Sequence, residues 1–290
     1  MKRRRIAKRE PRLDIELNGF RLDFSERTYV MGILNVTPDS FSDGGRFFNR
    51  KAAVRRALEM ERDGADIIDI GGESTRPGSR DVDAAEEAGR IITVIEAVAG
   101  RINIPVSVDT RKSKVAELAI RSGARIINDV SGLKNDGKMA SVAAKYNAAL
   151  IVMHMKGSPR DMQESPAYRD VVNDIIKSLE GSLAIARRAG VSEDKIIIDP
   201  GIGFGKTVGH NLEILNRLGE FKSLGRPICV GTSRKSFIGK VLDAPDTDQR
   251  LTGTLVSSAI AIMHGANLIR VHDVKETCEA VRMADSILRR

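Results

Sequence analysis

Several short apolar runs of this chain end in side chains that could bind a polar ligand. Asp109, Asn128 and Asp199 each close a run rich in Ile and Val. Carboxylate and amide oxygens in a half-buried position accept hydrogen bonds, which suits a flat heterocycle with amidine-like N–H donors. Lys235 follows another apolar run and could bond a ring carbonyl or a ring nitrogen of the same ligand. These residue types predict a site for a polar heterocycle.

A cationic pair stands at the end of the last apolar run. Arg270 and His272 lie two residues apart, so in a strand their side chains share one face. In barrels of alternating strands and helices, phosphate is often held beside the last two loops. Asn35 ends the first run and supplies a neutral oxygen, which could help to hold Mg²⁺ that phosphate already coordinates. The expected ligand therefore joins a heterocycle to phosphate.

Other polar residues near the ends of runs have a structural interpretation. Asp129 and Asp273 are of a type that turns and helix caps favour, so we interpret both as structural. His154 stands between two methionines, which favours a packed core histidine over a ligand. Pro200 and Lys206 occupy the places of required glycines, so the glycine-rich segment between them is neither a P-loop nor a dinucleotide-binding turn.

Eight apolar runs must position these side chains. They cover residues 29–36, 66–71, 105–109, 126–130, 149–153, 196–199, 228–231 and 268–271. They are rich in Ile and Val with little polar alternation, which is typical of parallel strands buried on both faces. Amphipathic segments cover residues 50–63, 84–99, 112–122, 138–146, 171–189, 211–218, 249–264 and 275–288. Every run ends in or is followed by polar residues, and charges buried together there need a partner such as a polar ligand.

This alternation predicts an α/β fold of the (β/α)8 type, the TIM barrel, because eight units fit the length and ligands bind at the carboxyl ends of the strands. The competing interpretation, a doubly wound open sheet, usually has a dinucleotide-binding glycine turn after its first strand, and none is present. Asn18-Gly19 between alternating apolar residues predicts a β-hairpin over residues 13–25. We expect a basic flexible tail over residues 1–12 and one barrel domain over residues 27–290.

Charge and composition exclude several classes of protein. The net charge is +8, but the first twelve residues hold seven basic residues and one acidic residue, which leaves the body near +2. A nearly neutral body with three tyrosines, eight phenylalanines and no tryptophan argues against a nucleic-acid partner. No apolar run is long enough to cross a membrane and no signal peptide is visible. The spacing of Cys229 and Cys278 fits no zinc motif, which favours buried reduced thiols and a cytoplasmic location.

Six segments together resemble the dihydropteroate synthase family. They are residues 32–45 (GILNVTPDSFSDGG), 71–78 (GGESTRPG), 107–110 (SVDT), 199–206 (DPGIGFGK), 233–236 (SRKS) and 270–273 (RVHD). The resemblance extends over about residues 30–279 and departs from the family pattern at no motif position. It implies a transferase of folate biosynthesis that condenses (7,8-dihydropterin-6-yl)methyl diphosphate with 4-aminobenzoate, giving 7,8-dihydropteroate and diphosphate.

The resemblance also assigns roles to residues. It places the pterin at Asp109, Asn128, Met153, Asp199 and Lys235; the diphosphate at Asn35, Thr75, Arg270 and His272; and the aminobenzoate at Thr75, Arg76, Pro77, Phe204, Lys235 and Ser236. The implied cofactor is Mg²⁺ at Asn35. The implied catalytic residues are Asp109, Lys235, Arg270 and His272, and Arg234 is expected to pack or pair near its loop. A homodimer through the last helices is also implied, and the apolar stripe Ala259, Ile260 and Met263 agrees with it.

The family is thought to ionise its pterin substrate before the amine attacks. Arg270, His272 and Mg²⁺ would then stabilise the leaving diphosphate, and Asp109 with Asp199 would stabilise the pterin cation. Residues 37–48 and 72–82 are rich in Gly, Ser, Pro and Asp, so we expect mobile loops that close and exclude water. Sulfonamides mimic the aminobenzoate, so the resemblance implies that these drugs inhibit the enzyme.

Two related functions would share parts of this pattern. A pterin-binding methyltransferase barrel would share the fold and some pterin contacts, but it has no use for the segment 233–236 or for the long first loop. A non-catalytic paralogue would keep the barrel, yet Asn35, Thr75, Arg270 and His272 are all intact. Both alternatives therefore explain fewer of the residues than a dihydropteroate synthase does.

Overall fold

Eight parallel strands form a barrel. The strands are β3 (Tyr29–Asn35), β4 (Ile67–Gly71), β5 (Val106–Asp109), β6 (Ile126–Asp129), β7 (Ala149–Met153), β8 (Ile196–Asp199), β9 (Cys229–Val230) and β10 (Leu268–Val271). Their order in the sheet is β8-β7-β6-β5-β4-β3-β10-β9. A parallel bridge between Ile198 and Ile228 joins the two outer strands and closes the sheet. The predicted (β/α)8 barrel is confirmed.

The structure is a computed structural model that describes residues 13–37, 46–74, 79, 81–158, 162, 164 and 166–288. The predicted basic tail, most of the first loop, and residues 75–78 and 80 of the second loop lie outside these residues. In the described part of the chain, no helix is long and apolar enough to cross a bilayer.

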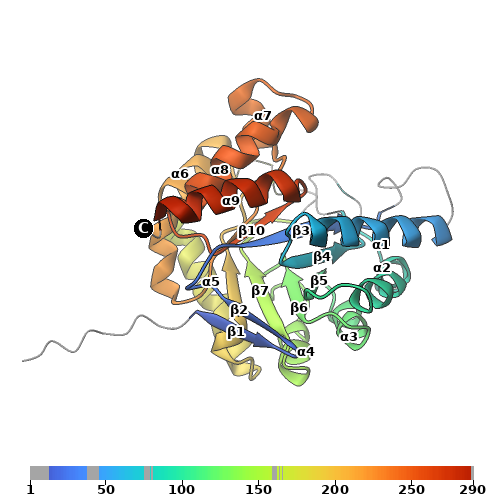
Figure 1. Ribbon diagram of the computed structural model, residues 1–290. Coiled ribbons are helices and arrows are strands. Elements are labelled where there is room, and N and C mark those ends of the chain that lie inside the picture. The colour runs from blue at the N-terminus through green and yellow to red at the C-terminus, as the bar shows by residue number, and fades with distance from the viewer. Residues whose placement is uncertain are drawn as a thin grey trace, which may run out of the picture.

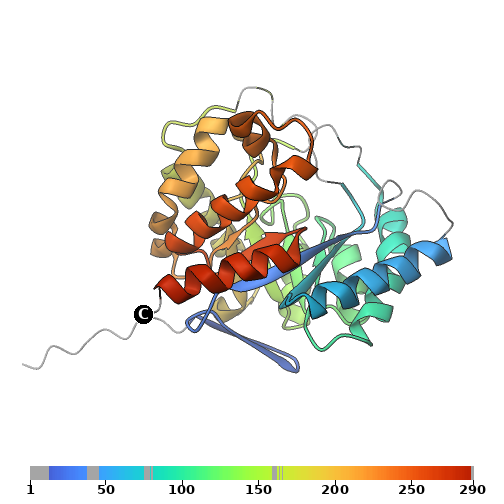
Figure 2. The ribbon, with the colours of Figure 1, turned by 45° about the horizontal axis from the view of Figure 1, so that its top comes forward.

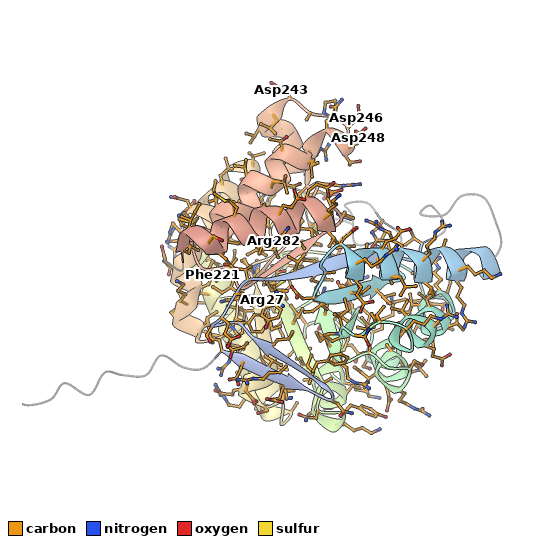
Figure 3. The ribbon with its side chains drawn as sticks, viewed as in Figure 1. Arg27, Phe221, Asp243, Asp246, Asp248 and Arg282 are labelled. Atoms are coloured by element: carbon orange, nitrogen blue, oxygen red, sulfur yellow. The ribbon has the colours of Figure 1, made fainter. Side chains whose placement is uncertain are left out.

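Helices surround the barrel, as Figure 1 shows. They are α1 (Arg46–Arg62), α2 (Ala84–Ala99), α3 (Ser113–Arg121), α4 (Met139–Lys145), α5 (Val171–Arg188), α6 (Val208–Asn216), α7 (Ser236–Leu242), α8 (Leu251–Met263) and α9 (Val274–Leu288). Short 3-10 turns cover Glu193–Lys195, Leu218–Leu224 and Asp248–Arg250. The connection from α7 to α8 carries Asp243, Asp246 and Asp248 at the outer tip of the molecule (Figure 3).

The helix α7 was not predicted from the sequence. Its seven residues are too few for a clear helical period, and Asp243 ends it in the left-handed conformation with φ 51°. Phe237 and Ile238 are buried, so tertiary packing stabilises a helix that the local sequence signals only weakly. The strand predicted at residues 228–231 is shorter in the structure. It is β9, of two residues, because only Cys229 and Val230 pair in register with β10.

The strands alternate between the barrel interior and the surrounding helices. Met31, Ile67, Ile126, Ile197 and Leu268 belong to one buried apolar cluster inside the barrel. The residues one position away on each strand, such as Val30, Ile68 and Ile127, belong to the larger cluster that packs against the helices. Side chains two positions further along a strand face the same way, so the residues after the interior apolar layer also point inward.

The predicted hairpin is present, and it closes the amino-terminal end of the barrel. Strands β1 (Asp14–Leu17) and β2 (Phe20–Asp23) pair antiparallel around Asn18-Gly19. Gly19 has φ 89°, a conformation that such a two-residue turn requires. Ile15, Leu22 and Phe24 join the apolar cluster inside the barrel, and Figure 1 shows the hairpin across the lower end of the strands.

The segment between the hairpin and the barrel is bonded to the start of the barrel strands β3 and β4. Arg27, labelled in Figure 3, donates from Nη1 to Asp66 Oδ2 at 3.0 Å. Its guanidinium also lies over the ring of Tyr29, with Cζ 4.0 Å from the ring centroid. Asp66 accepts a further bond from the Val30 backbone at 2.8 Å, so one carboxylate fixes the chain as it enters β3.

Candidate functional site

A polar layer lies directly above the apolar interior of the barrel, at the carboxyl ends of the strands. Asp69, Asp109, Asn128, Asp199 and Arg270 form it, and the four shorter side chains are buried. Because residues two apart on a strand share a face, Asp69 stands above Ile67 and Arg270 stands above Leu268. Figure 2 turns this end of the barrel toward the viewer. The structure thus brings together four site residues predicted from four different strands.

Arg270 pairs with two carboxylates at once. Its Nε lies 2.7 Å from Asp69 Oδ2, and its Nη2 lies 2.7 Å from Asp109 Oδ2. Burial alone would lower the pKa of this guanidinium, but the two carboxylates raise it above its ordinary value. Asp69 Oδ2 also accepts from Asn128 Nδ2 at 2.9 Å, so Asp69 connects the predicted diphosphate residue with a predicted pterin residue.

The pKa of the Asp109 carboxyl is raised toward neutrality. Burial raises the pKa of its carboxyl to about 7, even though Arg270 opposes the shift, and the neighbouring charge of Asp69 adds to it. A ligand with N–H donors would favour the ionised form. The position is also closely packed, because a Cβ on Gly71 would lie 3.4 Å from the Cβ of Asp109.

Asp199 and Lys235 form the opposite side of the polar layer. Asp199 Oδ1 accepts from the Gly201 backbone at 2.6 Å, and burial raises the pKa of this carboxyl while Lys235 lowers it. Lys235 donates from Nζ to the Ile202 carbonyl. Burial lowers the pKa of the Lys235 ammonium to about 8, with Asp199 opposing the shift. An amine of this kind both donates hydrogen bonds and changes protonation close to neutral pH.

Phe204 lies beside Lys235. The lysine Nζ is 4.7 Å from the centroid of the Phe204 ring, and both side chains are partly exposed. Gly203 precedes Phe204 and lies against Lys235, and a Cβ at this glycine would approach Lys235 Cδ to 2.9 Å in a backbone with φ 83°. The glycine therefore lets the predicted aminobenzoate residue Phe204 and the predicted pterin residue Lys235 share one wall.

Lys206 is a buried lysine of the segment 199–206, and the sequence patterns assign it no role of its own. Its Nζ lies 3.0 Å from His154 Nδ1, 2.9 Å from the Phe204 carbonyl and 3.4 Å from the His154 carbonyl. Burial lowers its pKa well below the ordinary value, and burial with the nearby lysines lowers the pKa of His154 to about 2. His154 is neutral and packed in the interior, as expected for a core histidine.

The remaining predicted residues lie around this layer. Met153 is buried at the end of β7, and Asn35 is half-buried at the end of β3. His272 Nδ1 lies 3.0 Å from Ser233 Oγ. Ser236 is exposed at the first position of α7. Thr75, Arg76 and Pro77, which were assigned to the diphosphate and the aminobenzoate, lie outside the described residues.

The residues interpreted as structural have local partners. Asp129 accepts from the Ser131 and Leu133 backbones at 2.9 and 2.8 Å, which defines a turn after β6. Asp273 Oδ2 accepts from Arg234 Nε at 3.1 Å. Arg234 therefore pairs near its loop, as predicted, and both aspartates have the local partners that a structural role requires.

A charged network anchors the start of the second loop, and no sequence signal had indicated it. Glu73 accepts from Arg111 Nη2 at 3.1 Å and from Lys112 Nζ at 2.8 Å. Arg111 also bonds Asp81 at 3.0 Å, and Lys112 pairs with the buried Glu87. Apart from Asp81, these partners come from the turn after β5 and from α2, so they become neighbours when β5 pairs with β4 and α2 packs beside them.

The chain is similar to a well-characterised group of enzymes. A family model described as "Pterin binding enzyme" matches residues 31–272. A protein of Clostridium beijerinckii named dihydropteroate synthase is 48% identical over 277 residues, which is 95% of this chain and 100% of that protein.

Solved structures agree. The dihydropteroate synthase of Clostridium difficile with pteroic acid has a TM-score of 0.88 and 47% identity, covering 93% of this chain and 100% of that one. The Xanthomonas albilineans enzyme with 4-aminobenzoic acid has a TM-score of 0.90 and 39% identity, covering 96% and 98%.

Proposed function

The chain belongs to the dihydropteroate synthase family of pterin-binding enzymes, and on that basis we propose how its residues divide the reaction. It is a transferase that condenses (7,8-dihydropterin-6-yl)methyl diphosphate with 4-aminobenzoate, and the products are 7,8-dihydropteroate and diphosphate. One observation supports the division of roles above all. Carboxylate, amide and cationic side chains from strands far apart in sequence meet in one polar layer at the mouth of the barrel.

The pterin ring binds to the polar layer. Asp109 and Asp199 accept hydrogen bonds from its N–H groups, Asn128 offers a further amide oxygen, and Lys235 donates to a ring oxygen or nitrogen. Met153, buried at the end of β7, packs against the ring face. The two carboxylates also favour positive charge on the ring, which develops when the leaving group departs.

The diphosphate binds on the cationic side, at Arg270, His272 and Thr75. The C–O bond to the pterin methylene breaks, its electron pair leaves with the diphosphate, and the pterin carries the positive charge. Asn35 has a half-buried neutral amide of the kind that fits Mg²⁺, and it would help to hold the ion. When bound, the ion would supply positive charge that stabilises the leaving group.

The aminobenzoate enters over Phe204 and Lys235, with Ser236 beside them and Thr75, Arg76 and Pro77 from the second loop. Its amine nitrogen attacks the pterin methylene to form the C–N bond, and the proton that it then loses passes to the released diphosphate. Phe204 offers a flat apolar wall for the aryl ring, and its neighbour Lys235 offers charge to the carboxylate or the pterin. Sulfonamides of similar shape are expected to compete for this wall.

The partner of this chain is a second copy of itself. An apolar groove runs between α6, α7 and α8, and its lining includes Leu212, Phe237, Val241, Val256 and Ile260. Val256 is 54% exposed and Val241 is 52% exposed. Apolar side chains that are exposed together in one patch often mark a surface that binds another protein. A homodimer through these helices would bury them. The predicted stripe with Ile260 and Met263 lies on the same helix, α8. A cytoplasmic location accords with a substrate set of small folate precursors.

One assay tests the proposed reaction. Purified protein is mixed with Mg²⁺ and the pterin diphosphate, and diphosphate release is followed with and without 4-aminobenzoate. We expect release that depends on the amine and forms dihydropteroate in equal amount. A protein that releases no diphosphate under either condition would refute the assignment of roles and the enzyme itself.

A further inference from the structure

Asp69 has no assigned role, although it lies at the centre of the polar layer. It is fully buried on β4, and a single oxygen, Oδ2, accepts both Arg270 Nε at 2.7 Å and Asn128 Nδ2 at 2.9 Å. We propose that Asp69 is a positioning residue that turns the acceptor end of Asn128 toward the pterin and holds the guanidinium of Arg270 in place for the diphosphate. This inference rests on the proposed function, because it concerns the same ring site.

Asn128 shows the effect most directly. An amide has a donor end and an acceptor end, and the two are nearly equal in shape. An ionised carboxylate only accepts, so it requires the NH2 end of Asn128 to face Asp69. The Oδ1 end then faces the ligand as an acceptor, which matches a ring that presents N–H donors. Without Asp69, either orientation of the amide would be allowed and this selectivity would be lost.

Arg270 is fixed by the same carboxylate from another side. Its planar guanidinium is held at Nε by Asp69 and at Nη2 by Asp109. Two carboxylates that bond different nitrogens of the guanidinium fix the plane of the group. A bond to Asp109 alone would let the guanidinium rotate about that hydrogen bond. Asp109 must also meet the ring, so Asp69 is the partner that keeps Arg270 in place when Asp109 turns to the ligand.

The cost of burying Asp69 argues that the residue serves the site. Its Oδ1 is buried and, within the described residues, has no hydrogen-bond partner. The hydroxyl of Ser107, its register neighbour on β5, is in the same condition. A buried charge with an unpartnered oxygen is less favourable than an apolar side chain of similar volume. Fold stability alone therefore does not explain a carboxylate at this position.

The test compares Asp69→Asn with the wild-type enzyme in ring binding and in turnover. The probes are 6-hydroxymethylpterin and 6-hydroxymethyllumazine; in the lumazine an oxygen acceptor replaces the 2-amino donor and N1 carries a hydrogen. We expect Asp69→Asn to weaken pterin binding by about tenfold, as for loss of one charge-assisted hydrogen bond. The preference for pterin over lumazine should fall as well, while KM for 4-aminobenzoate stays unchanged. Asp129→Asn, in an equally buried aspartate that bonds only its own turn, is the matched control.

A second variant and a double-mutant cycle keep the test decisive. Asp69→Ser removes the charge with a smaller side chain, and it replaces Asp69→Asn if that variant does not fold. In the Asn128→Ala background the Asp69 substitution should change ring affinity less than in the wild type, because Asp69 acts through Asn128.

Unchanged ring affinity and selectivity in a folded Asp69 variant would overturn the proposal. Failure of both Asp69 variants to fold, while Asp129→Asn and Asn128→Ala fold, would also overturn it, because Asp69 would then be structural. If the wild-type protein itself showed no synthase activity, the error would lie in the proposed function and not in the role of Asp69.

Discussion

At the scale of single residues, the site is a balance of buried charges. Asp69, Asp109 and Asp199 face Arg270 and Lys235 across a layer with little contact with water. In such surroundings an added or lost hydrogen bond has more effect on binding than it has at a surface. When the substrate binds, its N–H donors and its diphosphate are expected to replace some of the ion pairs and hydrogen bonds among these side chains, because they offer the same kinds of contact.

Arg270→Ala should lower turnover by a factor of about 100 or more, since the guanidinium stabilises charge that develops on the leaving diphosphate. The measurement is the rate of diphosphate release at saturating substrate. Arg234→Ala serves as a control, because that arginine pairs with Asp273 beside the loop. Near-normal turnover of Arg270→Ala would exclude this role.

Asp109 predicts a pH dependence of pterin use. Its folded pKa is about 7, so ionisation increases as the pH rises through neutrality, and kcat/KM for the pterin diphosphate should rise with it and level above about pH 8. The Asp109→Asn enzyme should have a lower kcat/KM for the pterin diphosphate, and this value should not rise with pH. A flat wild-type profile between about pH 6 and 8 would contradict the role of the ionised carboxylate.

The same shift has a consequence for stability. A carboxyl whose pKa is raised on folding binds more protons in the folded than in the unfolded state between its two pKa values. Its contribution is therefore fully present at pH below the unfolded value and is lost as the pH rises through about 7. Thermal unfolding of the wild type and of Asp109→Asn should be compared as the pH rises through about 7. The loss of stability that Asp109 causes in the wild type should be absent from the variant.

At the scale of elements, the segment from Gly201 to Lys206 carries Phe204 past the ends of β7 and β8. Gly201 and Gly205 have φ 70° and 64°, and a Cβ at either would collide with backbone carbonyls of His154 or Lys156. The segment is thus pressed against the chain that follows β7. Lys206 completes the contact by donating to the carbonyl of Phe204.

Lys206→Met should raise KM for 4-aminobenzoate by about tenfold, because the loss of a buried donor releases the backbone of Phe204. The pterin KM should change less. Lys240→Met, at an exposed lysine of α7, is the control for a lysine-to-methionine change. Equal aminobenzoate KM values in the wild type and the Lys206 variant would show that this lysine does not position the wall.

The hairpin makes a prediction about stability separate from activity. Phe24 is 1% exposed and fills the amino-terminal end of the barrel, opposite the polar layer. Phe24→Ala should lower the free energy of unfolding by about 3–5 kcal/mol, measured by chemical denaturation, and leave kcat/KM unchanged where the protein is folded. Phe20→Ala, at a half-buried site on β2, should cost less. A large loss of kcat/KM in folded Phe24→Ala would contradict the separation.

At the scale of the whole molecule, the exposed apolar side chains of α7 and α8 predict assembly. Val256→Asp places a charge in the groove and should convert the dimer into monomers, as measured by light scattering coupled to size exclusion. Leu118→Asp, at a 41% exposed position on α3, changes an apolar surface residue far from that groove and should leave the dimer intact. A wild-type protein that is monomeric at micromolar concentration would exclude this assembly.

The sequence by itself determined the order of the elements and most of the site. Runs of Ile and Val separated by amphipathic segments are local patterns, and eight of them specify the barrel. The polar side chains at their ends predicted Asp109, Asn128, Asp199 and Arg270, because parallel strands must bring their carboxyl ends to one mouth. The hairpin followed from Asn18-Gly19, whose turn chemistry is also local.

Only the tertiary structure decided how those side chains are paired. Arg270 and Asp69 are separated by 201 positions in the chain, and they meet because the barrel closes between its first and last strands. No local pattern shows that Asp69 holds two other residues, that Lys206 donates to Phe204, or that α7 forms against its neighbours. Strand ends are specified by short-range sequence patterns, whereas the partner of each buried charge depends on which atoms remain within hydrogen-bonding distance after closure.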